Sequence, residues 1–317
     1  MSLHEGPVGH HARSTRATSV AGMARLVYLG TPEAAVPPLR ALVDAGHDVA
    51  LVVTRPDKRR GRGSRLVASP VKAAALALGL AVTDDLAECT DVGAELGVVV
   101  AFGRIIPVAV LDLLPMVNLH FSLLPRWRGA APVERAILEG DAETGVCLMA
   151  VEAGLDTGGV YAVEATTIDP AETADELRTR LVAIGCRLLE RSLVDGRAGL
   201  PRPRDQAGNP TYAEKLAAHE LELDWSRPAV HLRRVVRLGR AWTTFRAKRL
   251  RVLTAGPPED GATAAVLAPG ALHGVEVGAG DGSRLTLVTV QPEGKRPMDA
   301  ADWLHGVHPG PDERLGT

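Results

Sequence analysis

Three polar side chains in this sequence have the chemical types and the spacing that acyl transfer to an amine needs. Asn118 and His120 lie two residues apart in the apolar run "MVNLHF", so on a strand they project from the same face. Asp156 follows in "GLDTGGV", where glycines suit a shaped loop that presents one carboxylate. A carboxylate orients an imidazole, the imidazole handles the amine proton, and a carboxamide donates to the developing oxyanion. The three types together predict direct acyl transfer.

Each of these residues also has a plainer explanation when it is taken alone. The backbone can satisfy a buried Asn118–His120 pair, and an Asp beside Gly commonly caps its own turn. The segment "SLLP", Ser122 to Pro125, favours the functional interpretation because it leaves the strand as a rigid loop with free backbone donors. Ser122 itself lacks the G-x-S-x-G elbow of a nucleophilic serine.

The composition excludes several other classes of protein. The chain has 317 residues, 46% of them hydrophobic, and a net charge of −2, so any nucleic-acid role must rest on local charge. Cys89, Cys147 and Cys186 form no CxxC pair, which argues against a disulfide framework or a zinc site and favours a reducing cytoplasm. No apolar run approaches the roughly 20 residues of a membrane helix, so we expect no membrane partner. We also expect no metal, because the sequence shows no cluster of metal ligands.

The elements that must position the three residues follow an α/β pattern. Val-rich apolar strands alternate with helical segments over most of the chain. The expected strands cover 25–30, 48–54, 96–103, 116–121, 145–153 and 158–168, and the expected helices cover 32–46, 69–80, 132–139 and 173–194. This order predicts a Rossmann-like doubly wound sheet, mostly parallel, with a ligand crevice at the strands' carboxyl ends. The turn "GTPEAAV" lacks G-x-G-x-x-G, so a dinucleotide is not expected.

The pattern changes in the last third of the chain. Pro, Gly and Asn interrupt the periodicity over 196–216, and a short helix at 227–239 precedes strand-like pieces separated by Gly-rich turns. Those pieces cover 249–255, 263–268, 273–280 and 284–292. They predict a small OB-like β-barrel. We therefore expect a disordered or added extension at 1–22, a catalytic domain at 23–203, a linker at 204–224 and the barrel domain at 225–317, with a frayed tail after Gly306.

Two concentrations of basic residues stand out. The first is the Pro/Gly-punctuated stretch "RPDKRRGRGSR", which has Asp57 as its one acidic residue. Its basic members are Arg55, Lys58, Arg59, Arg60, Arg62 and Arg65. The second runs from Arg233 to Arg251 and includes Arg249. A solvated loop is the plainer explanation of such runs, but the uniform sign favours phosphate binding.

The motifs in this order resemble the methionyl-tRNA formyltransferase family. The resemblance runs from about Met23 to about Gly306 and rests on "GTPEAAVPPL", "VVTRPDKRRGRG", "VVVAFGRIIP", "NLHFSLLPRWRGAAPV", "GLDTGGV" and "QPEGKRPMDAADWL". It implies the formyltransferase fold, N10-formyltetrahydrofolate as formyl donor, tetrahydrofolate as product and methionyl initiator tRNA as acceptor. It also implies a monomer that needs no metal and no protein partner.

By this resemblance Asn118, His120 and Asp156 take the catalytic positions, and the first basic loop faces the tRNA acceptor end. The second basic run, Arg249 included, fits RNA contact on the OB-like barrel. The folate-binding positions fall on Phe102, Gly103, Ile105, Ile106, Pro107, Ser122, Leu123, Leu124 and Pro125. Three other functions stay open: formylation of a sugar or nucleotide amine on the same fold, hydrolysis of formyl-folate, and a non-catalytic RNA-binding module. The first and second predict no use for the basic loop, and the third predicts a broken catalytic triad.

Overall fold

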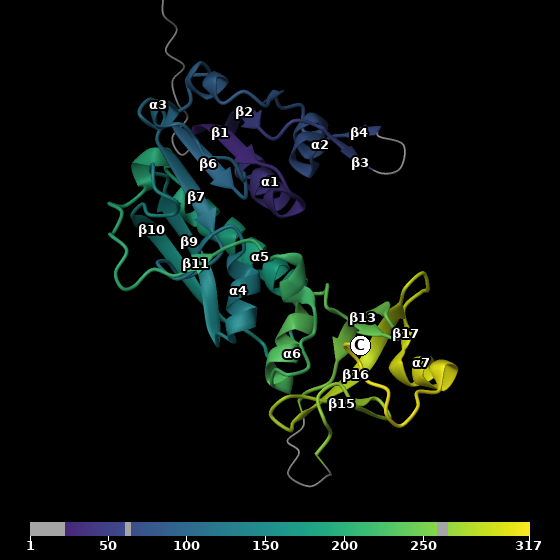
Figure 1. Cartoon of the computed structure of the whole chain (residues 1–317). Helices are drawn as coiled ribbons and strands as arrows, with labels where there is room; N and C mark the ends of the chain where they lie inside the picture. Colours follow the sequence, from purple (N-terminus) through teal and green to yellow (C-terminus); the bar gives the residue numbers. More distant parts are fainter. Residues whose placement is uncertain (1–22, 61–64, 259–265) are drawn as a thin grey trace, which may run out of the picture.

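The computed structural model describes residues 23–60, 65–258 and 266–317, in an N-terminal and a C-terminal domain (Figure 1). The N-terminal domain is built on a seven-stranded sheet of order β10-β9-β7-β6-β1-β2-β5. Its strands are β1 (Arg25–Gly30), β2 (Asp48–Val53), β5 (Val82–Thr83), β6 (Leu96–Val100), β7 (Met116–His120), β9 (Glu143–Ala150) and β10 (Val160–Thr167). The strands β7, β6, β1, β2 and β5 are parallel to one another. β9 pairs antiparallel with β7, and β10 pairs antiparallel with β9. The predicted mostly parallel α/β sheet is confirmed.

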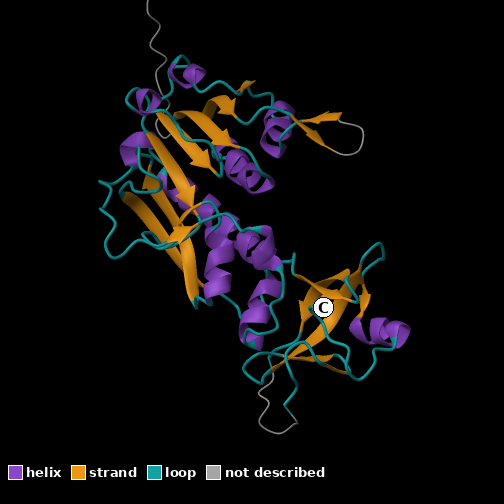
Figure 2. Ribbon diagram, in the orientation of Figure 1, coloured by secondary structure: helices purple, strands orange, loops and turns teal. Residues whose placement is uncertain are grey.

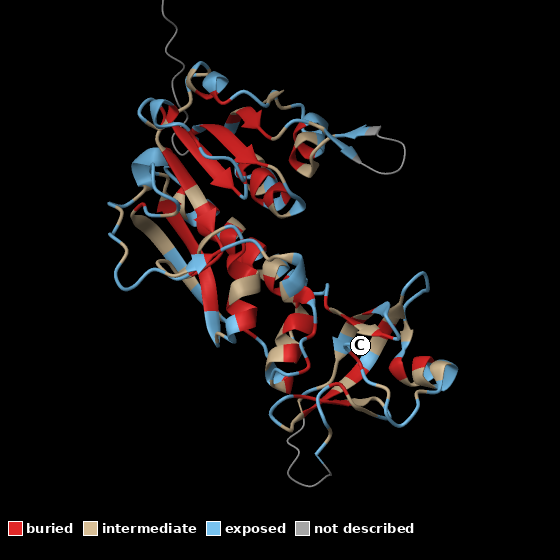
Figure 3. Ribbon diagram, in the orientation of Figure 1, coloured by how far each residue is buried: buried red, intermediate tan, exposed pale blue. Residues whose placement is uncertain are grey.

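Both faces of this sheet are buried, as its continuous apolar strands require. Along β1, Leu26 and Tyr28 enter one core cluster while Val27 and Leu29 enter a second one on the opposite face. The helices of this domain are α1 (Val36–Asp44), α2 (Pro70–Ala77), α3 (Val108–Leu111), α4 (Pro132–Glu139) and α5 (Ala174–Ser192). Figure 3 shows buried residues running along the strands and along the helix faces that cover them. The long helix α5 begins with a capping box between Thr173 and Glu176, as its sequence "TADE" favours.

The alternation of faces decides where the candidate residues lie. On β7, Val117 and Leu119 pack in the first cluster, and Met116 packs in the second. Asn118 and His120 therefore lie on the face of the second cluster, at the carboxyl end of their strand.

The C-terminal domain is an antiparallel sheet with two helices (Figure 2). Its strands are β12 (Trp242–Phe245), β13 (Lys248–Ala255), β14 (Leu272–His273), β15 (Glu276–Gly278), β16 (Arg284–Pro292) and β17 (Met298–Asp299), and its helices are α6 (Ala229–Arg237) and α7 (Ala300–Val307). The strand order is β12-β13-β16-β15-β14, with β17 also on β16. Within the described residues no pairing joins β12 to β14, so the predicted barrel is not closed.

One expected strand and the expected frayed tail need correction. Of the strand predicted at 263–268, residues 263–265 lie outside the described residues and 266–268 are irregular. The tail is packed rather than frayed: Leu315 is 3% exposed, and its amide donates to the Gly270 carbonyl at 2.9 Å. Glu313 also pairs with Arg246 at 2.6 Å. The prediction was wrong because two apolar residues among polar and small ones, Val307 and Leu315, give no periodicity, yet Leu315 still packs into the core cluster.

The two domains meet through helices α4 and α6. Arg234 of α6 donates to the Glu139 carbonyl at 3.2 Å, at the end of α4. Arg237 donates to the carbonyls of Asp169 and Glu172 at 2.8 and 2.7 Å. Burial lowers the pKa of the Arg237 guanidinium. Basic side chains of the second run thus dock one domain on the other.

Candidate active site

The structure brings Asn118, His120 and Asp156 together at the end of β7. His120 is 5% exposed, and its Nδ1 lies 3.6 Å from Asp156 Oδ2. The Asn118 carboxamide donates from Nδ2 to Asp156 Oδ1 at 3.4 Å across 38 residues of sequence. Asn118 is half-buried, so its second Nδ2 hydrogen remains available on the side that the sheet does not cover.

Asp156 is held by its backbone conformation and by a backbone amide. Its φ is 51°, in the left-handed region, which is uncommon for a residue other than glycine. Its Oδ2 accepts a hydrogen bond of 2.8 Å from the Gly129 amide. Gly158 approaches the Ala150 carbonyl so closely that a β-carbon there would lie 2.1 Å from the oxygen, so the loop needs this glycine. The carboxylate is therefore fixed in place before any ligand binds.

The connector between the domains contributes to this frame. Gln206 donates from Nε2 to the carbonyls of Asp156 and Gly158 at 2.9 and 2.8 Å. Its Oε1 accepts from the Arg128 guanidinium at 2.7 Å. The short strand β11 (Tyr212–Ala213) pairs with β8 (Arg128–Gly129), so the connector runs along the candidate site rather than away from it. The sequence reasoning missed these contacts, because nothing in "RDQAGNP" distinguishes Gln206 from an ordinary polar loop residue.

The loop after His120 is closed on itself. Ser122 is fully buried and donates from Oγ to the Arg126 carbonyl at 2.5 Å, which occupies its hydroxyl. Leu123, Leu124 and Pro125 are half-buried, and the Leu124–Pro125 peptide is cis. On the neighbouring strand β9, Cys147 is paired with His120, and burial raises the pKa of its thiol to about 11. Neither side chain is an activated nucleophile, in agreement with transfer directly to an external amine.

The segment 102–107 divides into a buried and an exposed part. Phe102 and Ile106 pack in the second core cluster, so their side chains support the loop from below. Gly103 has φ of 71° and its carbonyl accepts from the Arg55 guanidinium. Ile105 is 88% exposed, and Pro107 is exposed as well. A ligand at this loop would therefore meet backbone groups and Ile105 rather than the Phe102 ring.

The first basic run forms a hairpin and not the expected loop. Its strands β3 (Lys58–Arg60) and β4 (Arg65–Val67) pair with each other and project from the sheet (Figure 1). Lys58 and Arg59 are exposed. Arg60 and Arg65 take part through their backbones, and Arg62 lies outside the described residues. Arg55 precedes the hairpin, where its guanidinium holds the Gly103 carbonyl.

Some residues of the second basic run are paired within the protein, and others are exposed to solvent. Arg234 and Arg237 dock the domains, and Arg246 pairs with Glu313, whose pKa it lowers to about 2. Arg249 is exposed, and its guanidinium lies 4.3 Å from the centre of the half-buried Trp242 ring. Arg249 also borders a shallow recess whose other walls are Arg251, Gln291, Pro292, Glu293 and Gly294. This part of the run faces outward.

Among the residues that the structure describes, no three His, Cys, Asp or Glu side chains gather as metal ligands would. No helix within 23–60, 65–258 or 266–317 is long and apolar enough to cross a membrane.

Comparisons with solved structures agree with this architecture. An N-formyltransferase from Helicobacter canadensis, solved with folinic acid and dTDP-3-aminofucose, aligns with a TM-score of 0.66 at 16% identity, over 85% of this chain and 100% of its own. HypX from Aquifex aeolicus, solved with tetrahydrofolic acid, gives 0.59 at 18% identity over 89% of this chain and 47% of its own. Methionyl-tRNA formyltransferase from Clostridium thermocellum gives 0.53 at 15% identity over 74% and 93%. At these identities the similarity shows a shared fold.

Sequence comparisons go further. Residues 24–193 match the formyl transferase family, and residues 215–308 match the formyl transferase C-terminal domain. Methionyl-tRNA formyltransferase of Jannaschia sp. (strain CCS1) is 43% identical over 303 residues, 90% of this chain and 98% of that protein. The Streptomyces coelicolor protein of the same name is 42% identical over 92% of this chain and 99% of its own. With both domains matched and nine-tenths of its length aligned, the chain belongs to the formyltransferase family, among the methionyl-tRNA formyltransferases.

Proposed function

We propose that this protein transfers a formyl group from N10-formyltetrahydrofolate to the amino group of methionyl initiator tRNA. The observation that carries the proposal is the meeting of Asn118, His120 and Asp156 at the end of β7, in a chain whose two domains both match the family. Relatives that align over 90% and 92% of the chain carry the name of this activity.

The three residues have separate roles in the proposed reaction. A bond forms between the amine nitrogen and the formyl carbon while the bond from that carbon to the folate nitrogen breaks. Asn118 donates its second Nδ2 hydrogen to the oxygen that gains charge on the formyl carbon. His120 accepts the proton that the amine loses and returns it to the departing folate nitrogen, so the site ends as it began. Asp156 stabilises the imidazolium between these two transfers.

The proposed folate site uses the two loops beside the cluster. Segment 102–107 lies on the face of Asn118 and His120, because Phe102 and Ile106 pack in the cluster beneath that face. A flat heterocycle suits the exposed Ile105, Pro107 and the backbone of Gly103 as walls. Ser122 to Pro125 would contribute backbone groups, since the Ser122 hydroxyl is already occupied.

The proposed tRNA site uses both exposed basic surfaces. Lys58, Arg59 and the rest of the β3–β4 hairpin would contact phosphates near the acceptor end, where the methionyl amine must reach His120. Arg249 beside Trp242 offers the C-terminal domain a charge next to a flat ring, a pairing that suits RNA. We propose the division into 23–203, 204–224 and 225–317, and a monomer that works in the cytoplasm without a metal.

One assay tests the function. The protein is incubated with labelled formyl-folate and either methionyl initiator tRNA, methionyl elongator tRNA or an amino sugar nucleotide. Label in acid-precipitable initiator tRNA supports the proposal. Label on the sugar amine alone would replace it with the sugar N-formyltransferase alternative, and release of free formate from every sample would indicate a hydrolase.

A further inference from the structure

His120 is hydrogen-bonded through Nε2, and this contact determines where its proton lies. Nε2 is 2.8 Å from the backbone carbonyl oxygen of Trp127. A carbonyl oxygen can only accept, so Nε2 must carry the hydrogen. The neutral ring then has its lone pair on Nδ1, the nitrogen that lies 3.6 Å from Asp156 Oδ2. Nδ1 is therefore the one ring nitrogen able to take up a proton.

This arrangement gives Asp156 a selective effect. Neutral His120 presents a lone pair to the carboxylate and offers it no hydrogen. Once Nδ1 is protonated, the same nitrogen presents an N–H and a positive charge to Oδ2. Asp156 already accepts from the Gly129 amide and the Asn118 carboxamide, so it is kept facing the ring. It thus stabilises the imidazolium and leaves the neutral imidazole unaided.

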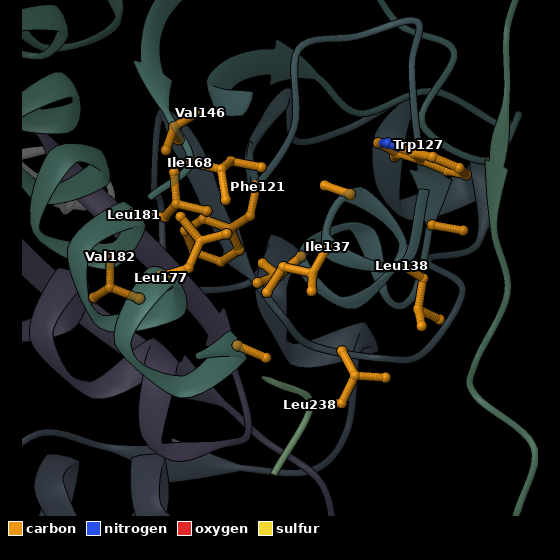
Figure 4. Packing of buried hydrophobic residues seen from close by; sticks show 14 of the residues in the cluster. Phe121, Trp127, Ile137, Leu138, Val146, Ile168, Leu177, Leu181, Val182 and Leu238 are labelled. Atoms are coloured by element: carbon orange, nitrogen blue, oxygen red, sulfur yellow. The ribbon is translucent and has the colours of Figure 1, made fainter. Parts of the chain in front are cut away.

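The Trp127 carbonyl is aimed by an unusual turn. Trp127 has φ of 63°, in the left-handed region, and the residue is 7% exposed. Its amide donates to Thr211 Oγ1 at 2.9 Å, and its indole Nε1 donates to Asp141 Oδ2 at 2.7 Å. Figure 4 shows Trp127 at the edge of the packed cluster that includes Ile137 and Leu138 of α4. Without these contacts a tryptophan would not hold this backbone conformation.

Asp141 holds the neighbouring residue as well. The Arg126 guanidinium donates from Nε to Oδ2 at 2.8 Å and from Nη2 to Oδ1 at 2.5 Å, a two-pronged pair that raises the pKa of Arg126. The same guanidinium lies 4.5 Å from the centre of the Trp127 ring. One carboxylate therefore receives three hydrogen bonds from the two residues that form the turn.

The end of α4 places Asp141 for this task. Gly140 follows the helix with φ of 75°, and its amide donates to the Ile137 carbonyl. The Asp141 amide donates to the Ala136 carbonyl at 2.9 Å, which completes a Schellman-type helix end. The Asp141 side chain is 14% exposed. Its carboxylate is thus fixed by local backbone geometry and can impose an orientation on Arg126 and Trp127.

We propose that Asp141 is a positioning residue for formyl transfer. By holding Arg126 and Trp127 it keeps the Trp127 carbonyl on His120 Nε2, and so reserves Nδ1 as the proton acceptor beside Asp156. The inference rests on the proposed catalytic role of His120. Asp141 itself touches no reacting atom.

The test compares three variants. Asp141→Leu removes all acceptors at similar size, Asp141→Asn keeps one acceptor for the Trp127 indole, and Glu139→Gln is the matched control. Glu139 is exposed at the same helix end, and its substitution keeps the three hydrogen bonds of Asp141. Thermal unfolding of each variant shows whether the fold persists, and Asp141→Asn serves if Asp141→Leu does not fold.

Two readouts distinguish positioning from general stability. In histidine-¹⁵N-labelled protein, long-range proton–nitrogen spectra should show His120 protonated on Nε2 in the wild type and a mixture of tautomers in the Asp141 variants, with the signal assigned by its loss in His120→Gln. The kcat for formylation should fall about tenfold to a hundredfold, as when a partner that orients a ligating histidine is removed. The KM values for tRNA and folate should stay near those of Glu139→Gln.

The outcomes separate this inference from the proposed function. A wild-type His120 protonated on Nδ1 would overturn the inference, and so would an Asp141 variant that is folded with an unchanged tautomer and a kcat equal to the control. The spectra need no acceptor substrate. If the wild type failed to formylate methionyl-tRNA, the proposed function would be lost while the spectra still decided the role of Asp141.

Discussion

The candidate catalytic cluster and the outward-facing basic surfaces are built in opposite ways. His120 is buried, and its partners Asp156 and the Trp127 carbonyl are each held by further hydrogen bonds. Lys58 instead lies exposed on the β3–β4 hairpin, and Arg249 lies exposed on β13 of the C-terminal sheet. A closed network makes each member indispensable, whereas exposed charges act through counterion release and add up. We therefore expect the rate of formyl transfer to depend on single residues of the cluster, and the affinity for RNA to depend on many basic residues together.

The largest effects should come from the cluster. Asn118→Ala, His120→Ala and Asp156→Ala should each lower kcat at least about a hundredfold, because removing one oxyanion donor alone commonly costs that much. Steady-state formylation with both substrates saturating measures it, and circular dichroism checks the fold. Near-normal turnover in any one variant would remove that residue from the catalytic assignment.

The next effect should come from the connector. Gln206→Leu removes the donors that hold the carbonyls of Asp156 and Gly158, so the carboxylate loses its fixed position and kcat should fall about tenfold. Asp205→Asn, an exposed neighbour, is the control and should leave kcat close to the wild-type value. If the two variants have the same kcat, the connector only links the domains. The hydrogen-bonded network around the catalytic cluster would then not extend to Gln206.

The hairpin should affect binding and leave the chemistry intact. Replacing Arg59, Arg60 and Arg62 by Gln should weaken tRNA binding and lower the slope of log K against log salt by about 0.7 to 0.9 for each phosphate that the protein no longer neutralises. Folate binding should not change, because no folate-binding role is assigned to the hairpin. Filter binding across a salt series measures the slope. An unchanged slope together with normal formylation would show that the hairpin is a solvated ribbon that does not bind tRNA. Formylation of a sugar or another small amine would then be the better interpretation.

A basic residue of the second run should show the reverse behaviour. Arg237→Leu leaves the carbonyls of Asp169 and Glu172 without their donor at the domain interface, so the free energy of unfolding should fall by about 1.5 to 3 kcal/mol. Urea unfolding measures this decrease. The salt slope of tRNA binding should match that of the wild type. A lower slope would show that Arg237 binds RNA, as the other basic residues of its run suggest, and that its hydrogen bonds at the domain interface do not describe its main role.

The smallest effect should appear at acid pH in the C-terminal tail. The Arg246 guanidinium lowers the pKa of Glu313 to about 2, so this pair stabilises the packed tail above the unfolded value of about 4.3. The contribution should be lost as pH falls from there through about 2. Limited digestion by pepsin across this window should release the tail progressively. Cleavage is expressed relative to that of an unstructured peptide substrate, because the activity of pepsin itself changes over this window. On that scale Arg246→Met should make release of the tail independent of pH, and a wild type equally resistant at both ends of the window would contradict the role of the pair.

Local patterns in the sequence were enough to predict much of this protein. The strand from Arg25 to Gly30 and the helix from Pro132 to Glu139 follow from unbroken apolar runs and a helix-starting proline. Period-two alternation placed Asn118 and His120 on one face, because successive side chains of any strand point to opposite sides. The glycine-flanked Asp156 completed the set by its chemical type, and the family motifs agreed with it.

The tertiary structure alone decided which groups hold the candidate residues and which charges remain free. The Trp127 carbonyl, the Gly129 amide and Gln206 reach the cluster through backbone atoms and long-range contacts, and a backbone atom carries no mark of residue type. The same reason explains the basic runs. Arg237 and Arg249 look alike in sequence, but one meets the carbonyls of another domain and the other meets solvent. Charge is set by the residue, whereas its partner is set by the fold.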